Sequence, residues 1–140
     1  MMKKYFYLIF LFLADIILKQ IALRDAEGFF IIPRIFAFYF FKNSALAFSI
    51  KFPQSVIVIF SILILMGLLF FVWQKPCFFF PITLIILGAI SNLFDRISYG
   101  YVVDYFYLFP VSYFNLADLL IFSGLILLII KLYRHKQKKI

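Results

Sequence analysis

Two aspartates stand where long apolar runs end, in a chain of 140 residues that contains only six acidic residues. Asp104 lies in the segment Tyr101-Val-Val-Asp-Tyr105, and Asp118 lies in Phe114-Asn-Leu-Ala-Asp118. Removing a carboxylate from water is unfavourable unless a partner or a reaction uses it, so both are candidates for function. If folding brings them together, they share a proton near neutral pH. One then activates water for attack on an amide carbonyl and the other stabilises the oxyanion, as in aspartic proteases.

The residue types alone also allow non-catalytic roles for Asp104 and Asp118. Asn115 is a good helix N-cap and Asp118 falls at the third helical position, so capping by itself accounts for Asp118. Capping does not account for Asp104, whose nearest basic residue in the sequence is Arg96. A divalent cation bound by Asp95, Asp104 and Asp118 is a further alternative.

Other catalytic chemistries fit the sequence less well. The only histidine, His135, lies in the basic C-terminal tail, far along the chain from both aspartates. That position disfavours a Ser or Cys nucleophile activated by histidine, and one His with the single Cys77 disfavours zinc. A serine paired with Lys19 would leave both aspartates without a role. The aspartate chemistry requires no metal and no organic cofactor.

Further polar residues recur at helical spacing inside the apolar runs. Asp15 and Lys19 are four residues apart, so they share one helix face and can neutralise each other inside a helix bundle. Gly88, Asn92 and Arg96 repeat at the same spacing. This stripe either joins helices in the membrane or supports a site near their outer end. Asp95, next to Arg96, is expected to point to the aqueous side.

The composition determines the setting of these residues. Hydrophobic residues make up 66% of the chain, 22 residues are phenylalanine, and the mean hydropathy is +1.09. Too little polar surface is left for a soluble protein, so the chain is an integral membrane protein. Apolar runs at 5–23, 54–73, 78–94 and 115–133 are long enough to cross a hydrocarbon layer of about 30 Å as helices. We expect an all-α membrane protein with four transmembrane helices, in which residues 1–140 form a single domain.

Basic residues orient these helices. Eight of the fourteen Lys and Arg residues flank the runs on the side that holds both termini: Lys3, Lys4, Lys75, Lys131, Arg134, Lys136, Lys138 and Lys139. The other side has Arg24, Arg34, Lys42, Lys51 and Arg96, spread over much more sequence. Basic residues favour the cytoplasm, so we expect both termini inside and both aspartates outside. The charged Asp15 and Lys19 also argue that the first run is retained rather than cleaved as a secretory signal.

Two segments on the outer side have their own character. Residues 29–50 are rich in aromatic and β-branched residues, which favours short strands. Phe38–Phe41 and Ala45–Ser49 flank Lys42–Ser44, a pattern typical of a hairpin-like apolar platform. The platform either holds a lipid or an extended peptide, or simply covers the helix ends. Residues 99–113 contain five tyrosines, which indicates a segment along the outer membrane interface.

Five polar blocks occur in a particular order along the chain. They are Asp15-x-x-x-Lys19, Asn43-Ser-Ala-Leu-Ala-Phe-Ser49, Gly88-Ala-Ile-Ser-Asn92-x-x-Asp-Arg96, Gly100-Tyr-Val-Val-Asp104 and Phe114-Asn-Leu-Ala-Asp118. In this order they closely resemble the lipoprotein signal peptidase family, also called signal peptidase II, over nearly the whole chain. The resemblance implies an aspartyl endopeptidase of the bacterial inner or plasma membrane. Such an enzyme removes the signal peptide from a prolipoprotein just before its diacylglyceryl-modified cysteine.

The resemblance also implies roles for particular residues. The catalytic dyad corresponds to Asp104 and Asp118, and the supporting polar positions correspond to Asp15, Lys19, Asn43, Asn92, Arg96 and Asn115. The outer β-cradle of the family corresponds to 29–50, and its interfacial helix corresponds to the Tyr-rich segment around Asp104. The chain departs from the family at Ala45, Leu87 and Ser91, where glycine is usual, and the added side chains bear on backbone packing and substrate fit there.

The expected partners are lipid-modified prolipoproteins and membrane phospholipids, and the protein is expected to act as a monomer without nucleic acid. The basic tail is suited to anionic headgroups rather than to nucleic-acid recognition. A small transporter that uses Asp15, Lys19 and the outer acids as a relay is the main alternative. It is disfavoured because the second run is apolar from Val56 to Trp73 apart from Ser61 and Gly67. A noncatalytic assembly factor is a third alternative.

Overall fold

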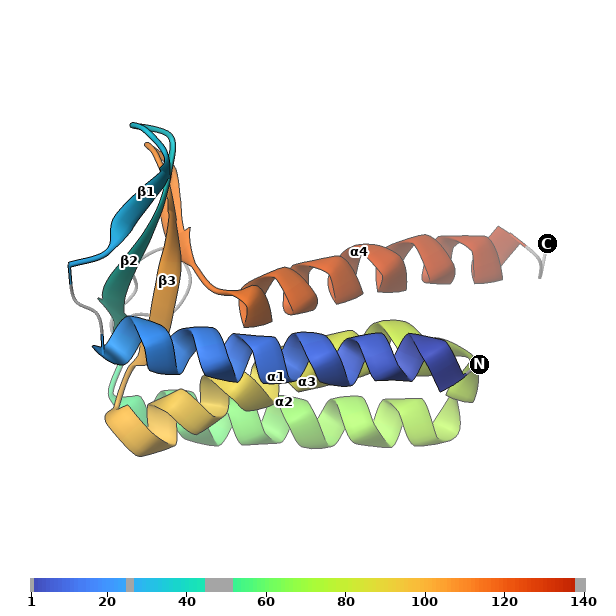
Figure 1. Cartoon of the computed structure of the whole chain (residues 1–140). Coiled ribbons are helices and arrows are strands. Elements are labelled where there is room, and N and C mark those ends of the chain that lie inside the picture. Colours follow the sequence, from blue (N-terminus) through green and yellow to red (C-terminus); the bar gives the residue numbers. More distant parts are fainter. Residues whose placement is uncertain (1, 25–26, 45–51, 138–140) are drawn as a thin grey trace.

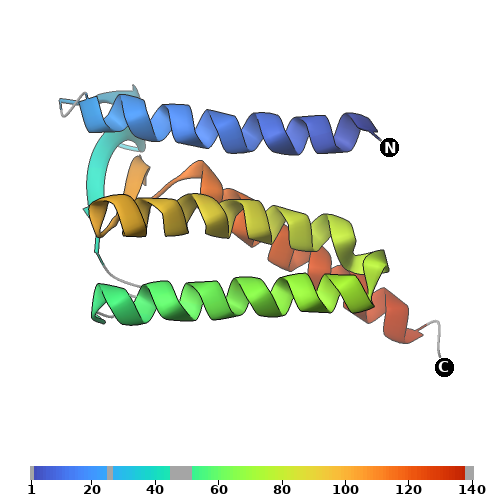
Figure 2. The ribbon, with the colours of Figure 1, turned by 90° about the horizontal axis from the view of Figure 1, so that it is seen from below.

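Four long helices form the body of the protein (Figures 1 and 2). The computed structural model describes residues 2–24, 27–44 and 52–137. The long helices are α1 (Met2–Arg24), α2 (Gln54–Gln74), α3 (Phe79–Tyr99) and α4 (Leu116–Gln137), and the short 3-10 helix η2 (Pro76–Phe78) joins α2 to α3. Each long helix contains a stretch long and apolar enough to cross a membrane. The four predicted spans are therefore confirmed, with α3 continuing past its expected end.

The helices pack around α3, which contacts each of the other three. Leu8, Leu84 and Leu120 form a small core between α1, α3 and α4. Helix α2 buries only Ile57 and Leu65. Apolar side chains on the outer surfaces of the helices remain exposed, as expected for helices that face lipid rather than water.

A four-stranded antiparallel sheet lies at one end of the helices, opposite the start of α1 and the end of α4 (Figure 1). Its strands follow the order β1 (Phe29–Ile32), β2 (Phe36–Asn43), β3 (Val102–Leu108) and β4 (Ser112–Phe114). Ala22 of α1 packs with Phe38, Val103 and Tyr105 in a second core that joins the sheet to the helices. The predicted small sheet on one side of the membrane helices is confirmed.

One detail of the predicted outer region is wrong. The Tyr-rich segment contains strands β3 and β4 instead of an interfacial helix, because its β-branched and aromatic residues favour strands and β2 offers a full edge for pairing. The described part of the platform contains a hairpin between β1 and β2 that turns at Pro33 and Arg34, since proline has no amide hydrogen for the ladder and Arg34 adopts a left-handed φ of 61°. Lys42 and Asn43 belong to β2. The remainder of the platform, including Ala45, lies outside the described residues.

A glycine sets the passage from α3 into β3. Gly100 ends α3 in a left-handed conformation with φ of 78°, and its N–H donates to the Arg96 carbonyl at 3.1 Å. Glycine adopts this conformation without a steric penalty, so the helix stops there and the chain reverses into the sheet. Asp104 thereby lies in β3, opposite Phe41 of β2.

Helices α3 and α4 approach closely at two glycines. A Cβ atom on Gly88 would collide with the Ala117 carbonyl oxygen and would come within 2.8 Å of the Ile121 side chain. A Cβ on Gly124 would lie 2.7 Å from the Pro81 carbonyl oxygen. Gly88, the small residue of the predicted polar stripe, therefore lies where α3 and α4 join.

Gly88→Ala is expected to lower the free energy of unfolding by about 1–3 kcal/mol, because the added methyl group must push α4 away from α3. Thermal unfolding in detergent measures this loss. Gly67→Ala is the matched control, since within the described residues nothing beyond the neighbouring backbone of α2 lies within 4 Å of the position that its Cβ would occupy. Alanine is the better helix former, so this control is expected to be neutral or slightly stabilising. Equal melting temperatures for the two variants would contradict the close approach.

Candidate active site

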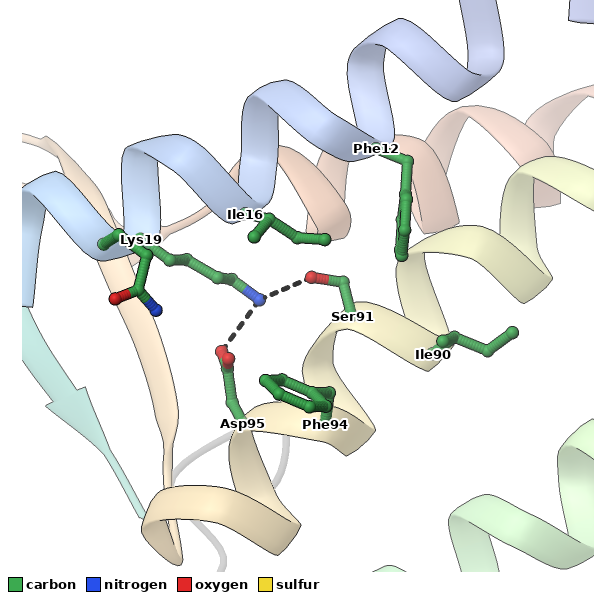
Figure 3. Close-up of a pocket in the computed structure, with 8 residues that line it drawn as sticks. Phe12, Ile16, Lys19, Ile90, Ser91, Phe94 and Asp95 are labelled. Carbon is green, nitrogen blue, oxygen red and sulfur yellow. Dashed lines mark hydrogen bonds and ion pairs between the residues drawn. The ribbon is translucent and has the colours of Figure 1, made fainter.

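A buried lysine is the centre of a polar cluster between α1 and α3 (Figure 3). The Lys19 ammonium lies 3.1 Å from Asp15 Oδ2 and 2.8 Å from Asp95 Oδ2. It also donates to the Ser91 hydroxyl at 2.9 Å and to Asn92 Oδ1 at 3.0 Å. Only 2% of Lys19 is exposed, and a buried charge is tolerated only when it is paired and hydrogen-bonded. The cluster therefore holds α1 to α3, beside a cavity of about 170 Å³ with an otherwise largely apolar lining.

The same cluster holds the start of α4 in place. Asp15 Oδ1 accepts hydrogen bonds from the Tyr105 hydroxyl at 2.8 Å and from the Ala117 N–H at 3.0 Å. The Tyr105 oxygen in turn accepts from the Leu116 N–H at 3.0 Å. The first amides of a helix have no partner within the helix, so Asp15 and Tyr105 supply partners for the first two amides of α4. As a result, the position of α4 depends on both α1 and β3.

Asn92 connects the lysine cluster to Asp118. Its amide oxygen faces Lys19 because an ammonium group only donates hydrogen bonds. The amide nitrogen must then point the other way, where it donates to Asp118 Oδ1 at 2.8 Å. The Lys19 ammonium on α1 thereby determines that the nitrogen of the Asn92 amide, and not its oxygen, contacts the Asp118 carboxylate on α4.

Asn115 caps α4 and also reaches both aspartates. Its Oδ1 accepts the Asp118 N–H at 2.8 Å, while its own N–H donates to Asp118 Oδ2 at 3.2 Å. This reciprocal pair is a capping box. Because the helix amide occupies the side-chain oxygen, the amide nitrogen faces away and donates to Asp104 Oδ1 at 2.8 Å and to Asn92 Oδ1 at 3.1 Å. One residue therefore holds a carboxylate from β3 and a carboxylate from α4.

Asp104 is fully buried at the end of the sheet. Its second oxygen, Oδ2, accepts a hydrogen bond from Asn43 Nδ2 of β2 at 2.8 Å. Burial, with a further contribution from the charge of Asp118, raises the pKa of Asp104 from 3.8 to about 7. Hydrogen bonds from Asn43 and Asn115 oppose this rise without cancelling it. Near neutral pH, Asp104 can therefore hold a proton or release it.

The chain is similar to known proteins over most of its length. A sequence model of the family described as "Signal peptidase (SPase) II" matches residues 7–134. A lipoprotein signal peptidase of Lactococcus lactis subsp. lactis (strain IL1403) is 35% identical over 131 residues, covering 88% of this chain and 85% of that protein. One of Clostridium tetani (strain Massachusetts / E88) is 38% identical over 120 residues, covering 77% and 76%.

The chain belongs to the signal peptidase II family. Two solved structures described as bacterial membrane enzymes agree in fold. The first has a TM-score of 0.88 and 25% identity, and the match covers 100% of this chain and 93% of the other. The second has a TM-score of 0.81 and 26% identity, with 94% and 93% covered. The predicted family, the multi-pass membrane fold and the enzyme class, an aspartic peptidase, are confirmed.

All of the predicted site residues lie in or beside one network, and their roles stay predictions. Asp15, Lys19, Asn43, Asn92 and Asn115 make the contacts given above. Arg96 lies one helical turn after Asn92 on α3, and its Nη1 is 3.4 Å from Gln54 Oε1 of α2. The alternative that Asp118 caps α4 is also correct, because Asp118 forms the capping box with Asn115. Asn115 in turn binds Asp104. Among the described residues, no three His, Cys, Asp or Glu side chains cluster closely enough to hold a metal ion.

Three important residues of the network were misjudged or missed from the sequence. Asp95 was expected to face water, but it is buried, binds Lys19 and accepts the Val103 N–H at 3.1 Å. Its spacing of four residues from Ser91 places both on one helix face, which was an available signal. Ser91 stood out only as a departure from glycine, and Tyr105 only as one of several interfacial tyrosines. No local pattern indicates that Tyr105 binds Asp15.

Ser91→Ala is expected to lower the free energy of unfolding by about 1–3 kcal/mol, the usual effect of leaving buried polar groups short of a partner. Ser91 is 3% exposed, donates to Asp15 Oδ2 at 2.5 Å and accepts from Lys19. Ser61→Ala is the control, because within the described part of the chain the Ser61 hydroxyl bonds only the Ile57 carbonyl of its own helix. Thermal unfolding of both variants measures the difference. An equal, negligible loss in both would mean that the Ser91 hydroxyl adds nothing to the cluster.

Proposed function

We propose that Asp104 and Asp118 are the catalytic dyad of a membrane endopeptidase that cleaves signal peptides from diacylglyceryl-modified bacterial prolipoproteins, just before the lipidated cysteine. Membership of the signal peptidase II family supports this reaction. The observation that carries the choice of residues is the double contact of Asn115, which binds Asp104 through its side chain and Asp118 through its capping box. Two acids held by one residue can share a proton, as an aspartic peptidase requires.

The proposed reaction uses water and the two carboxylates. One aspartate, unprotonated, removes a proton from a water molecule that attacks the scissile carbonyl. The other, protonated, donates a hydrogen bond to the developing oxyanion and then helps to protonate the leaving amine. Which aspartate takes which role is left open, because a coupled pair titrates as a unit. Asp15, Lys19, Asn43, Asn92, Arg96 and Asn115 act as positioning residues, and no cofactor takes part.

The proposed topology places both termini in the cytoplasm of a bacterial cell and the dyad at the outer face of the plasma or inner membrane. The sheet, whose strand β3 contains Asp104, and the start of α4, which contains Asp118, lie at one end of the helices, and α1 begins and α4 ends at the other (Figure 1). The excess of Lys and Arg at the latter end supports this orientation. Substrate would enter from the membrane, with its signal helix among the spans and its lipidated cysteine near the dyad. Residues 1–140 would act as one domain and as a monomer.

Incubation of the purified protein with a lipidated precursor and its unlipidated form tests this function. Cleavage of the lipidated form alone, just before the modified cysteine, is the expected result, and mass spectrometry of the products identifies the cut. Equal cleavage of both forms would contradict the proposed substrate class. Ion flux in liposomes without any cleavage would favour the transporter alternative.

The rate of cleavage is expected to fall as the pH rises through about 7, the raised pKa of Asp104. Above this pH both carboxylates are ionised, so the proton that the oxyanion needs is lost. The rate also falls in acid, where both carboxylates become protonated and no base remains. Measuring kcat/KM against pH on the folded enzyme gives the profile. A rate that keeps rising above neutral pH would contradict a shared proton at Asp104.

A further inference from the structure

The end of the sheet that lies farthest from the helices carries exposed apolar side chains. Two turns meet there, residues 32–35 between β1 and β2 and residues 108–111 between β3 and β4, and we call them the sheet tip. The Phe109 N–H donates to the Ile35 carbonyl at 2.9 Å, so the turns form one surface. Its large apolar side chains are all well exposed: Ile32 48%, Ile35 53%, Leu108 38%, Phe109 57% and Val111 73%.

We propose that the sheet tip is a membrane anchor, which lies in the lipid headgroup layer and upper acyl chains of the leaflet on the sheet side. An apolar surface of this kind is unfavourable in water and marks a contact with a protein or a membrane. The position of the tip favours a membrane over a protein as the contact. The sheet extends across the direction of the helices and its tip projects beyond α4, so it overhangs the space beside the bundle rather than the bundle itself (Figure 1). That space is filled by lipid when the helices span a bilayer.

The charge of the sheet tip supports the same occupant. The sheet tip has a single charged residue, the exposed cation Arg34, and no acid. An arginine among apolar side chains suits the headgroup layer, where guanidinium binds phosphate oxygens in pairs of hydrogen bonds. The tip thus combines an apolar body with a cation, as membrane-surface segments do.

A fluorescence measurement on the substrate-free protein tests the anchor. The chain has one tryptophan, Trp73. In a Trp73→Phe background, Val111→Trp places a single reporter at the sheet tip, and Gln137→Trp places one at the basic C-terminal end of α4. Both proteins are reconstituted into vesicles of phosphatidylcholine and phosphatidylglycerol, with and without bromine on the acyl chains near the glycerol. The reporter at position 111 is expected to be quenched by the brominated lipid as strongly as Trp73 is in the unmodified protein, and more strongly than the reporter at position 137.

Two results would overturn the proposal. Strong quenching at position 111 by iodide in the buffer, with none by the brominated lipid, would mean that the tip stands in water. Protection from both quenchers would mean that protein covers it, such as a second copy of the chain. If Val111→Trp fails to fold, Ile35→Trp reports on the neighbouring turn. Because the readout does not depend on cleavage, failure of the anchor is distinguishable from failure of the aspartate dyad.

Arg34 supplies a separate test of the headgroup contact. Arg34→Asn removes the cation but keeps a residue that tolerates the left-handed backbone at this position. In the Val111→Trp background, adding phosphatidylglycerol to the vesicles is expected to strengthen quenching by brominated lipid. Arg34→Asn is expected to abolish that increase, and Arg34→Lys is expected to keep it. An increase that survives in Arg34→Asn would show that Arg34 does not bind the headgroups.

Discussion

Asp104→Asn and Asp118→Asn are each expected to lower cleavage of a lipidated precursor by about 10²–10⁴-fold, the range for loss of a general acid or base. Asparagine has nearly the size of aspartate but neither releases nor carries the proton that the dyad shares. The two residues are also expected to act as a unit, because both are held by Asn115. The double variant should therefore lose little more activity than either single variant. Product formation over time by the purified variants measures these losses.

Folding must be checked in the same variants. Asp104 accepts hydrogen bonds on both oxygens, from Asn43 and Asn115, and asparagine at that position can accept on only one of them. Thermal unfolding therefore accompanies each assay, and an active-site loss is one that occurs in a protein which still unfolds cooperatively. Near-normal turnover by either single variant would rule out the dyad. Losses that multiply in the double variant would contradict the shared action of the two acids.

Lys19→Met is expected to lower the free energy of unfolding by about 3–5 kcal/mol, the usual loss when one partner of a buried ion pair is removed. Asp15 and Asp95 would remain in the bundle without their cation, and neither is more than 3% exposed. Cleavage is expected to fall as well. The Lys19 ammonium binds the Asn92 amide oxygen and so keeps the amide nitrogen toward Asp118. Without the ammonium, the amide loses this orientation. Denaturant unfolding in detergent and the cleavage assay measure the two effects.

Lys75→Met is the matched control for this variant. Lys75 is exposed just after α2, with its ammonium 5.4 Å from the centre of the Phe71 ring. Its replacement is expected to change stability by no more than about 0.5 kcal/mol, as for most exposed positions. Adding Asp15→Asn and Asp95→Asn to Lys19→Met should recover part of the lost stability, since it removes the unpaired charges. If the triple variant is no more stable than Lys19→Met, loss of packing rather than unpaired charge is the cause.

Local sequence determines the parts of this protein that depend on near neighbours in the chain. Apolar runs of sufficient length predict the four helices, because a backbone in lipid must satisfy its own hydrogen bonds. The spacing of four between Asp15 and Lys19 predicts their ion pair, and Asn115 with Asp118 predicts the capping box. The five sequence blocks predict the family. The β-rich outer region was also visible in composition, although the helix expected around Asp104 was wrong.

Only the tertiary structure decided how these parts meet. The contact of Lys19 with Asp95, and that of Tyr105 with Asp15, join residues that are far apart in the chain and carry no shared local pattern. The strand at Asp104 depends on pairing with β2, and the raised pKa of Asp104 depends on its burial and on the charge of Asp118. Burial, strand pairing and charge coupling are properties of distances between elements. Sequence therefore determined which acids could react, while folding determined that Asn115 holds both of them.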